Sequence, residues 1–206
     1  IHVGGGCSRG VIRNIIAENG ATNDDLIAFN ADDAFDYRHN HYLFPEEISD
    51  ITVDNVIAEN CWTAVRMLSV EAPIRNVTIN NLAAGVREMG LNFDATRYAG
   101  DRIFDPANYP DGVGHIENVR FKNVLLWKTR DKDTPLCVIE SNCRGVVFEN
   151  FRRDLSRDVL PGEPFFRFDD LAKTAVCADG ETIGLACGER KTLDGGAYKK
   201  ITVDRN

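Results

Sequence analysis

Hydrophobic and polar residues alternate in short stretches along the chain, and one eight-residue phrase with this alternation recurs. Its copies span residues 12–19, 48–55, 74–81, 116–123 and 143–150. In each copy the first, fourth and sixth positions are apolar and the eighth position is Asn. An apolar–polar–apolar alternation is typical of a strand with one buried face. The phrase therefore predicts five equivalent strands, each of which ends at an asparagine.

The spacing of the copies predicts how these strands are arranged. The copies begin between 26 and 42 residues apart, so a unit of about 26 residues with insertions in two units accounts for them. This unit is too short for a propeller blade and lacks the helical pattern of tetratricopeptide or ankyrin repeats. Strand-rich repeats of this length favour a β-solenoid, in which each coil stacks on the next at about 4.8 Å. The sequence thus predicts an all-β fold.

A second strand is expected in each coil after a variable turn. The segments are residues 26–30, 64–68, 91–95, 136–141 and 165–170. Their alternation predicts one outward-facing column, made of Ala28, Arg66, Asn92, Val138 and Arg167. The recurrent Asn at the end of each phrase is expected to bridge backbone groups and its own neighbours at the turn, which is a structural role.

The whole chain, residues 1–206, is expected to form one domain. Regular coils are predicted over 10–170 and a terminal coil and cap over 171–206, where residues 198–205 resemble a weak sixth copy. Two longer segments, 34–47 and 95–114, are predicted to be surface loops, where binding sites are often built. Since no polar cap precedes the first coil, we expect an upstream domain or a second copy of the chain to cover that end.

Composition narrows the classes of function. The chain has 206 residues, 43% of them hydrophobic, and a net charge of −8, which fits a globular domain and argues against a nucleic-acid partner. Its apolar runs are far shorter than the roughly 18 residues of a membrane span, so we expect no membrane partner. The six cysteines form no CxxC pair, which argues against a zinc site. Cys177 and Cys187 are spaced to close a short loop, or the cysteines are small buried hydrophobes.

The densest group of acidic residues lies at 21–42. It contains Asp24, Asp25, Asp32 and Asp33, followed by Arg38, His39 and His41. Crowded carboxylates resist ionising together, which places an acid next to a base, and glycoside hydrolysis needs such a pair. We therefore name Asp24, Asp25 and Asp33 as candidate catalytic residues. Two alternatives stay open, namely that these aspartates cap turns or that they bind calcium.

Other residues are candidates for binding a substrate. Arg66 projects from the predicted outward column, where a guanidinium can bind a sugar carboxylate through two hydrogen bonds. The alternative for Arg66 is a surface salt bridge with a stacked acid. Asp94 lies on a nearby predicted strand and is expected to complete a cleft. Arg38 and His41 lie in the loop beside the acidic cluster, where an imidazole can orient substrate or transfer protons. No metal ligand set and no nucleotide-binding motif accompanies them.

The phrase and the acidic segment together resemble the parallel β-helix enzymes that degrade pectin, especially the polygalacturonase-like glycoside hydrolases. Residues 23–25 (Asn-Asp-Asp) followed by 26–29 look like the family's aspartate element, and Arg66 looks like the arginine of its Arg-Ile-Lys motif. The family's Gly-His-Gly element is absent. The resemblance implies a right-handed parallel β-helix, here of about six coils, and carboxylate acid–base chemistry on a polysaccharide.

Three classes of function are open at this point. The first is a glycoside hydrolase, and the second is a polysaccharide lyase, which would need a basic residue at the scissile sugar and often calcium. The third is a non-catalytic, glycan-binding solenoid similar to tailspikes or adhesins. For all three we expect a polysaccharide or oligosaccharide partner and an extracellular or periplasmic location. For a hydrolase we expect no cofactor, with calcium as the alternative.

Overall fold

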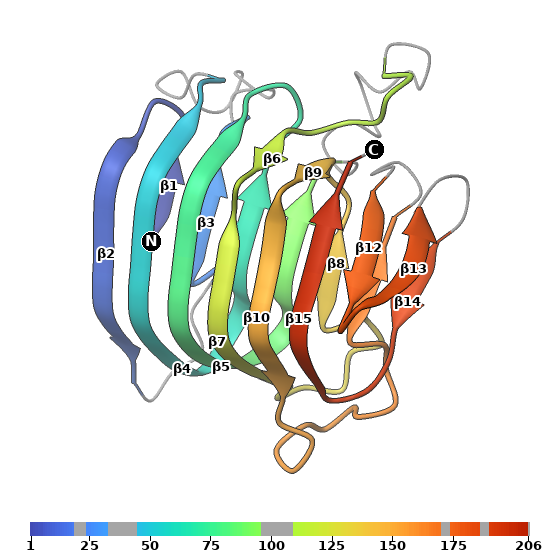
Figure 1. The fold of residues 1–206 in the computed structure, drawn as a ribbon. Coiled ribbons are helices and arrows are strands. Elements are labelled where there is room, and N and C mark those ends of the chain that lie inside the picture. Colours follow the sequence, from blue (N-terminus) through green and yellow to red (C-terminus); the bar gives the residue numbers. More distant parts are fainter. Residues whose placement is uncertain (19–23, 33–44, 96–108, 170–173, 186–189, 206) are drawn as a thin grey trace.

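The computed structural model describes residues 1–18, 24–32, 45–95, 109–169, 174–185 and 190–205. The described residues form β-strands, turns and irregular segments and contain no helix, so the all-β prediction is confirmed. All strands belong to one 15-stranded sheet (Figure 1). They are β1 (His2–Gly4), β2 (Ser8–Ala17), β3 (Ile27–Asn30), β4 (Ile48–Leu68), β5 (Ile74–Asp94), β6 (Ile116–Glu117), β7 (Arg120–Lys128), β8 (Cys137–Ile139), β9 (Cys143–Arg144), β10 (Val146–Arg153), β11 (Phe166–Phe168), β12 (Ala175–Ala178), β13 (Glu181–Leu185), β14 (Lys191–Leu193) and β15 (Ala197–Asp204).

Most of the sheet is built from five consecutive repeat units that lie side by side and run parallel. We number these units 1 to 5: β2 with β3, β4, β5, β6 to β8, and β9 to β11. In every unit the strands pair with the equivalent strands of the next unit. The pairing of β3, β4, β5, β8 and β11 aligns the predicted outward column of Ala28, Arg66, Asn92, Val138 and Arg167. The prediction of a second strand in each unit is therefore confirmed.

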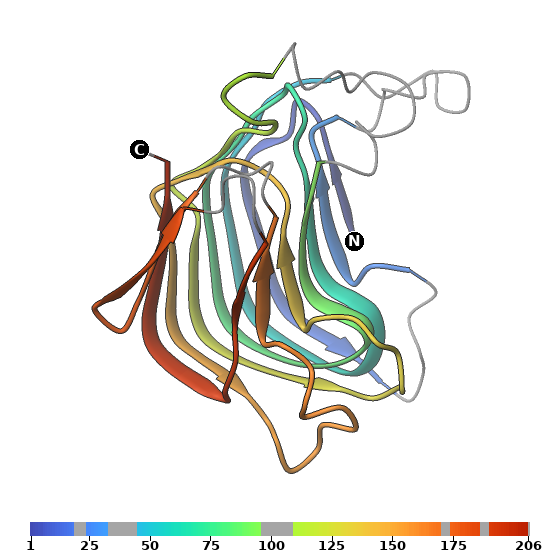
Figure 2. The same ribbon diagram turned by 90° about the vertical axis from the view of Figure 1, so that its right-hand side faces the viewer.

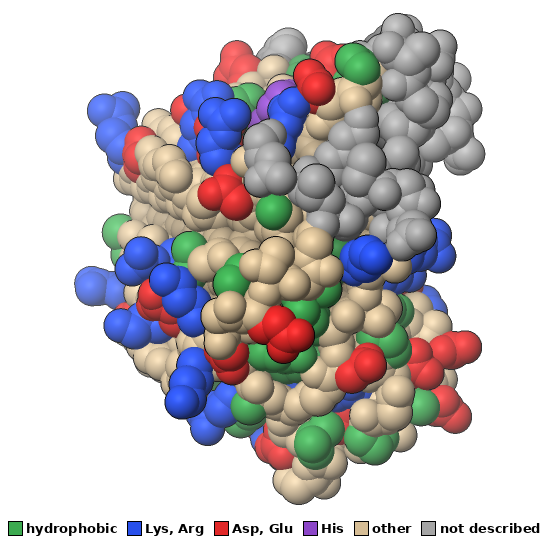
Figure 3. Space-filling model, turned by 45° about the vertical axis from the view of Figure 1, so that its right-hand side comes forward, with side chains coloured by type: hydrophobic (Ala, Val, Ile, Leu, Met, Phe, Trp, Pro, Cys, Tyr) green, Lys and Arg blue, Asp and Glu red, His purple; other side chains and the backbone are tan. Residues whose placement is uncertain are grey.

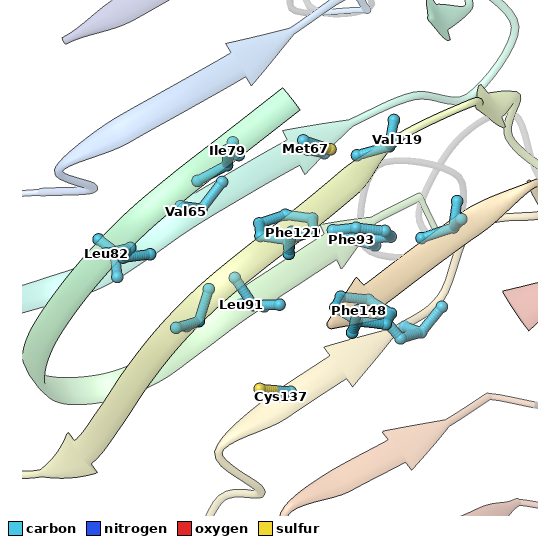
Figure 4. Close-up of a cluster of buried hydrophobic side chains, with 14 of the residues drawn as sticks. Val65, Met67, Ile79, Leu82, Leu91, Phe93, Val119, Phe121, Cys137 and Phe148 are labelled. Atoms are coloured by element: carbon cyan, nitrogen blue, oxygen red, sulfur yellow. The ribbon is translucent and has the colours of Figure 1, made fainter. Parts of the chain in front are cut away.

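Each unit bends so that its beginning and its end face each other across the interior (Figure 2). We call the two sides the first face (β2, β7, β10 and the first halves of β4 and β5) and the second face (β3, β8, β11 and the ends of β4 and β5). The core lies between them. Phe121 on the first face packs against Phe93 on the second at 6.0 Å between ring centroids, and Phe148 lies close to both (Figure 4). Burying such large side chains is the main driving force that holds the two faces together.

The asparagines that end the phrase form a ladder on the first face. In units 2 to 5 the aligned residues are Asn55, Asn81, Asn123 and Asn150, as predicted. Asn123 donates its side-chain amide to Asn81 at 3.1 Å, and Asn150 donates to Asn123 at 2.8 Å. All four have positive φ angles between 48° and 58°. Asn tolerates this left-handed conformation better than other residues with a Cβ, so the ladder marks a turn that each unit repeats.

The first copy of the phrase was assigned to the wrong residues. The pairing of β2 with β4 sets Arg13 opposite Asp54 and Ile15 opposite Val56, which aligns Asn14 with Asn55. Asn55 also donates a 2.9 Å hydrogen bond to the Asn14 side chain. The first copy is thus residues 7–14 instead of 12–19. The error arises because apolar alternation continues through both stretches and both end in Asn, and Asn19 lies outside the described residues.

The C-terminal segment is not a sixth copy. β15, which contains the repeated Ile-Thr-Val-Asp letters, pairs with β10 in the antiparallel direction. β12 then pairs antiparallel with β15, and β14 pairs antiparallel with β11. Alternation of apolar and polar residues does not specify the direction of a strand. Ile201 and Val203 are buried in this antiparallel strand, and a parallel strand would bury them equally well. The regular units end at Phe168, and the antiparallel strands cover the last of them.

The opposite end of the sheet has exposed strands. β2 pairs with β4 alone among the described strands, and Val11 and Ile16 of β2 are 68% and 63% exposed. Whether another chain covers this end stays a prediction. No helix in the described residues is long and apolar enough to cross a membrane. The predicted surface loops at 34–47 and 95–114 fall largely outside the described residues.

Candidate functional site

A cavity of about 330 Å³ lies on the outer side of the second face, across units 3, 4 and 5. Its lining residues are Glu88, Met89, Asn92, Asp94, Thr134, Pro135, Val138, Glu140 and Arg167. Asn92 and Asp94 belong to β5, Val138 belongs to β8 and Glu140 follows it, and Arg167 belongs to β11. The stacking of units thus gathers residues that are as many as 79 positions apart in the chain at one surface depression.

Alternation along the strands explains why these side chains point outward. The pairing sets Asn92 opposite Val138 and Val138 opposite Arg167. The residues between the outward positions, Phe93, Ile139 and Phe168, are fully buried in the core. Asp94 and Glu140 occupy the next outward position of neighbouring strands, and the Glu140 amide donates to the Phe93 carbonyl at 2.8 Å. Their Cα atoms are therefore about 4.8 Å apart, the usual strand separation.

Two arginines on the second face bind the carboxylates of this surface. A guanidinium nitrogen of Arg66 donates to Asp94 at 3.0 Å, and the other terminal nitrogen lies 3.8 Å from Asp25. Arg167 donates to Glu140 at 3.2 Å. The Asp94 and Arg66 side chains are 2% and 11% exposed, whereas Glu140 and Arg167 are 15% and 25% exposed. Partial burial strengthens such pairs compared with those on an open surface.

The other end of the cavity is formed by the bend between the two faces. Glu88 pairs with Lys132, and the Glu88 carbonyl accepts hydrogen bonds from Lys128 and from the Thr134 hydroxyl. The Lys128 side chain is fully buried and also donates to Thr134 at 2.6 Å. Burial lowers the pKa of Lys128 to about 8, because a charged ammonium is poorly solvated there. Lys128 thus supports the cavity wall from behind.

The structure brings three of the candidate residues together. Asp25, Arg66 and Asp94 form one ion-paired group on the second face. Asp24 is exposed, and neither Asp24 nor Asp25 lines the cavity. Asp33, Arg38 and His41, together with His39, lie outside the described residues.

Asp32 has a structural role. This fully buried carboxylate accepts hydrogen bonds from the backbone amides of Val70, Glu71 and Ala72. Burial raises the pKa of Asp32, although the amides oppose this by favouring the ionised form. The alternative expected the aspartates to cap turns at the ends of their own strand, whereas Asp32 binds the amides of residues 70–72, 38 to 40 positions along the chain.

Asp94 is the one lining residue that was named as a candidate, and Glu140 and Arg167 are among those that were missed. Arg167 was predicted to belong to the outward column but was given no role, and Glu140 was not considered. The signal for Glu140 was its place two residues after Val138, because alternation puts both on the same side of the strand. Counting two residues onward from every member of the column would have found it.

Other candidate chemistry finds no support at this site. The Trp62 ring lies 5.2 Å from the cations of both Arg87 and Lys132, which favours packing against these side chains over stacking on a sugar. The described residues hold no cluster of three potential metal ligands. Cys7, Cys61, Cys137, Cys143 and Cys177 are free thiols, and Cys187 lies outside the described residues.

Comparisons with known proteins do not identify a relative. No family model, no curated protein and no solved structure matches this chain.

Proposed function

We propose that the chain is a right-handed parallel β-helix that binds a polysaccharide on its second face and hydrolyses it there. The observation that carries the proposal is the cavity in which Asp94, Glu140 and Arg167 meet from three neighbouring units. The in-register parallel pairing of units 1 to 5 supports the β-helix, and parallel connections within a sheet are nearly always right-handed. A cavity that runs across the strands suits a chain-like ligand.

The environments of the two carboxylates suggest how they would divide the reaction. Asp94 is almost completely buried and held in place by Arg66, so its fixed position suits the role of base or nucleophile. Glu140 is more exposed and has the longer contact, at 3.2 Å, so it is the carboxyl group more accessible to a leaving oxygen, and we assign it the role of general acid. Side chains on neighbouring strands lie about 5 Å apart, which favours the retaining mechanism. Arg167 and Asn92 would bind sugar oxygens.

A reducing-end assay on a panel of polysaccharides tests this proposal. We expect Glu140→Gln and Asp94→Asn to lower kcat by about 10²-fold or more, since general acid–base groups contribute this much. Glu181→Gln is the matched control, because Glu181 is exposed on β13 away from the cavity. Circular dichroism of each variant checks that it is folded. Turnover that is unchanged in both cavity variants would overturn the assignment.

A binding function without catalysis is the second candidate. One observation favours it, namely that Asp94 and Glu140 are each engaged by an arginine, an arrangement that holds both carboxylates in place without requiring catalysis. In that case a polysaccharide embedded in an affinity gel slows the migration of the wild-type protein, but the protein releases no reducing ends from it. Glu140→Gln would then change the retention and nothing else. For either function we propose an extracellular or periplasmic location, where such polymers occur.

A further inference from the structure

A second pocket, of about 210 Å³, lies at the corner where units 4 and 5 begin and where the chain's last described residue ends. It is lined by Gly114, His115, Glu117, Asn142, Cys143, Arg144 and Arg205. His115 precedes β6, Arg144 ends β9, and Arg205 follows β15. The pocket shares no lining residue with the cavity of the second face.

Two arginines and one glutamate line this pocket, although the chain carries a net charge of −8. Asp204 lies beside it and accepts from the backbone amides of Gly145 and Arg205. Arg144 is exposed and forms no ion pair with the described residues. Arg205 has one carboxylate partner, Asp111, at 3.2 Å, and that aspartate is 76% exposed. Lys and Arg side chains also gather on the side of the sheet that carries β10 and β15, on the left of Figure 3. A concentration of cations of this kind attracts anions.

The remaining polar groups of the pocket leave Arg144 without a carboxylate partner among the described residues. Glu117, the acidic residue of the lining, is already bound by Arg75 at 3.0 Å. Asn142 is 5% exposed and donates its side-chain amide to the Asp111 carbonyl at 2.8 Å. Its Oδ1 is buried and accepts no hydrogen bond from the part of the chain that is described. A buried acceptor without a donor is uncommon and is satisfied when a ligand supplies a hydroxyl.

We propose that this pocket binds a protonated oxyanion or an oxyanion on a hydroxyl-bearing molecule, held between Arg144 and Arg205. The guanidinium groups donate to the oxyanion oxygens, and a hydroxyl of the same ligand donates to Asn142. Hydrogen phosphate has both groups, whereas sulfate has the charge without the donor. Because Arg205 follows β15 and Arg144 belongs to β9, the anion also ties the C-terminal strand to unit 5.

Calorimetric titration with inorganic phosphate, with sulfate as a second arm, tests this site. The buffer keeps ionic strength constant with sodium chloride, which removes general screening. We expect saturable binding of phosphate that is weaker by about tenfold in Arg144→Gln, since a hydrogen bond to a charged group contributes on this scale. Sulfate should bind more weakly than phosphate. The wild-type melting temperature should rise with phosphate concentration, because a ligand of the folded state stabilises it.

Two variants control for charge alone. Arg120→Gln removes an exposed arginine of β7 outside the pocket and should leave phosphate binding unchanged. Glu117→Gln removes the carboxylate of the lining and should tighten binding. Titration without saturation, or equal binding by Arg144→Gln and Arg120→Gln, would show an adventitious anion at most and overturn the proposal. Neither result depends on whether the cavity of the second face has hydrolase activity.

Discussion

The first and second faces contrast in how strictly the units repeat. On the first face the same turn residue recurs at five consecutive levels, from Asn14 to Asn150. Asn55 donates to Asn14, Asn123 to Asn81 and Asn150 to Asn123, while Asn81 donates to Asp54. On the second face the outward residue changes at every level of the aligned column, from Arg66 through Asn92 and Val138 to Arg167. The first face repeats because its left-handed turns restrict the residue type. The second face has ordinary extended backbone there, so its outward positions are free to form a site.

The largest expected effect concerns the core that both faces share. Phe148 is fully buried and its ring centroid lies 5.2 Å from that of Phe121 and 5.3 Å from that of Phe166. Phe148→Ala should lower the free energy of unfolding by about 3–5 kcal/mol, from lost burial and the cavity it leaves. Urea denaturation measures this. Val11→Ala, at a 68% exposed position, should change stability by less than about 0.5 kcal/mol.

Ion pairs should differ in strength between a partly buried and an exposed surface. Arg66→Met leaves Asp94 and Asp25 without this cation and should cost about 1.5–3 kcal/mol of unfolding free energy. Arg75 likewise has two carboxylate partners, Glu47 and Glu117, but is 41% exposed. Arg75→Met should therefore cost less than about 1 kcal/mol. Equal losses in urea denaturation would contradict the idea that the second face shields its charges.

Substitutions in the ladder separate backbone strain from hydrogen bonding. Asn123 has a φ of 57° and bonds to the asparagines on both sides. Asn123→Ala should lose both hydrogen bonds and add strain, while Asn123→Gly loses the hydrogen bonds alone. We expect the alanine variant to be less stable than the glycine variant by about 1 kcal/mol in chemical denaturation. If the glycine variant were only as stable as the alanine variant, or less stable, the turn conformation would not be what restricts the residue type at this position.

The smallest effect concerns the bend that joins the two faces, where Lys128 is buried. Its pKa of about 8 in the folded protein lies below the ordinary value of 10.5. Between these two pH values the unfolded chain binds one more proton, so this group makes stability rise with pH. The slope is at most about 1.4 kcal/mol per pH unit. Chemical denaturation at pH 8 and at pH 9 measures the free energy of unfolding. Between these pH values it should rise less, or fall more, in Lys128→Met than in the wild type.

That pH comparison needs the variant because other groups act in the opposite direction. Burial raises the pKa of Cys61 to about 12, and it also raises the pKa of Cys137 and Cys143. Above the ordinary thiol pKa of 9.0 the unfolded chain loses protons that the folded chain keeps, so the thiols lower stability. The difference between wild type and Lys128→Met removes this shared contribution. A difference that does not change between pH 8 and pH 9 would contradict the lowered lysine pKa.

Sequence periodicity was sufficient to predict the parts of the fold that repeat. The alignment of Asn55, Asn81, Asn123 and Asn150, and the outward column of the second face, follow from alternation and spacing alone. Strand direction was not predictable in the same way, because an alternating pattern reads identically in both directions. β15 is the example, since its Ile201 and Val203 lie in the core although the strand runs antiparallel to β10.

The candidate site was harder to predict because it depends on which units become neighbours. Arg66 and Asp94 were found since each stands in a predicted second strand. Glu140 and Arg167 are 27 positions apart in the chain, and they form an ion pair only because β8 and β11 are adjacent. The crowded aspartates drew attention by proximity in sequence, yet Asp32 serves the backbone of residues 70–72.

Most paired residues of β4 and β5 are 26 positions apart in the chain, which means that a further unit of this length could be inserted. Ile48 pairs with Ile74 and Val53 with Ile79, and Asn76 donates to Asp50 exactly one 26-residue period earlier. Duplicating residues 48–73 would give the added segment matching neighbours above and below, while β15 would still close the far end. Evolution or a designer can thus lengthen the second face by one level at a time without redesigning the ends.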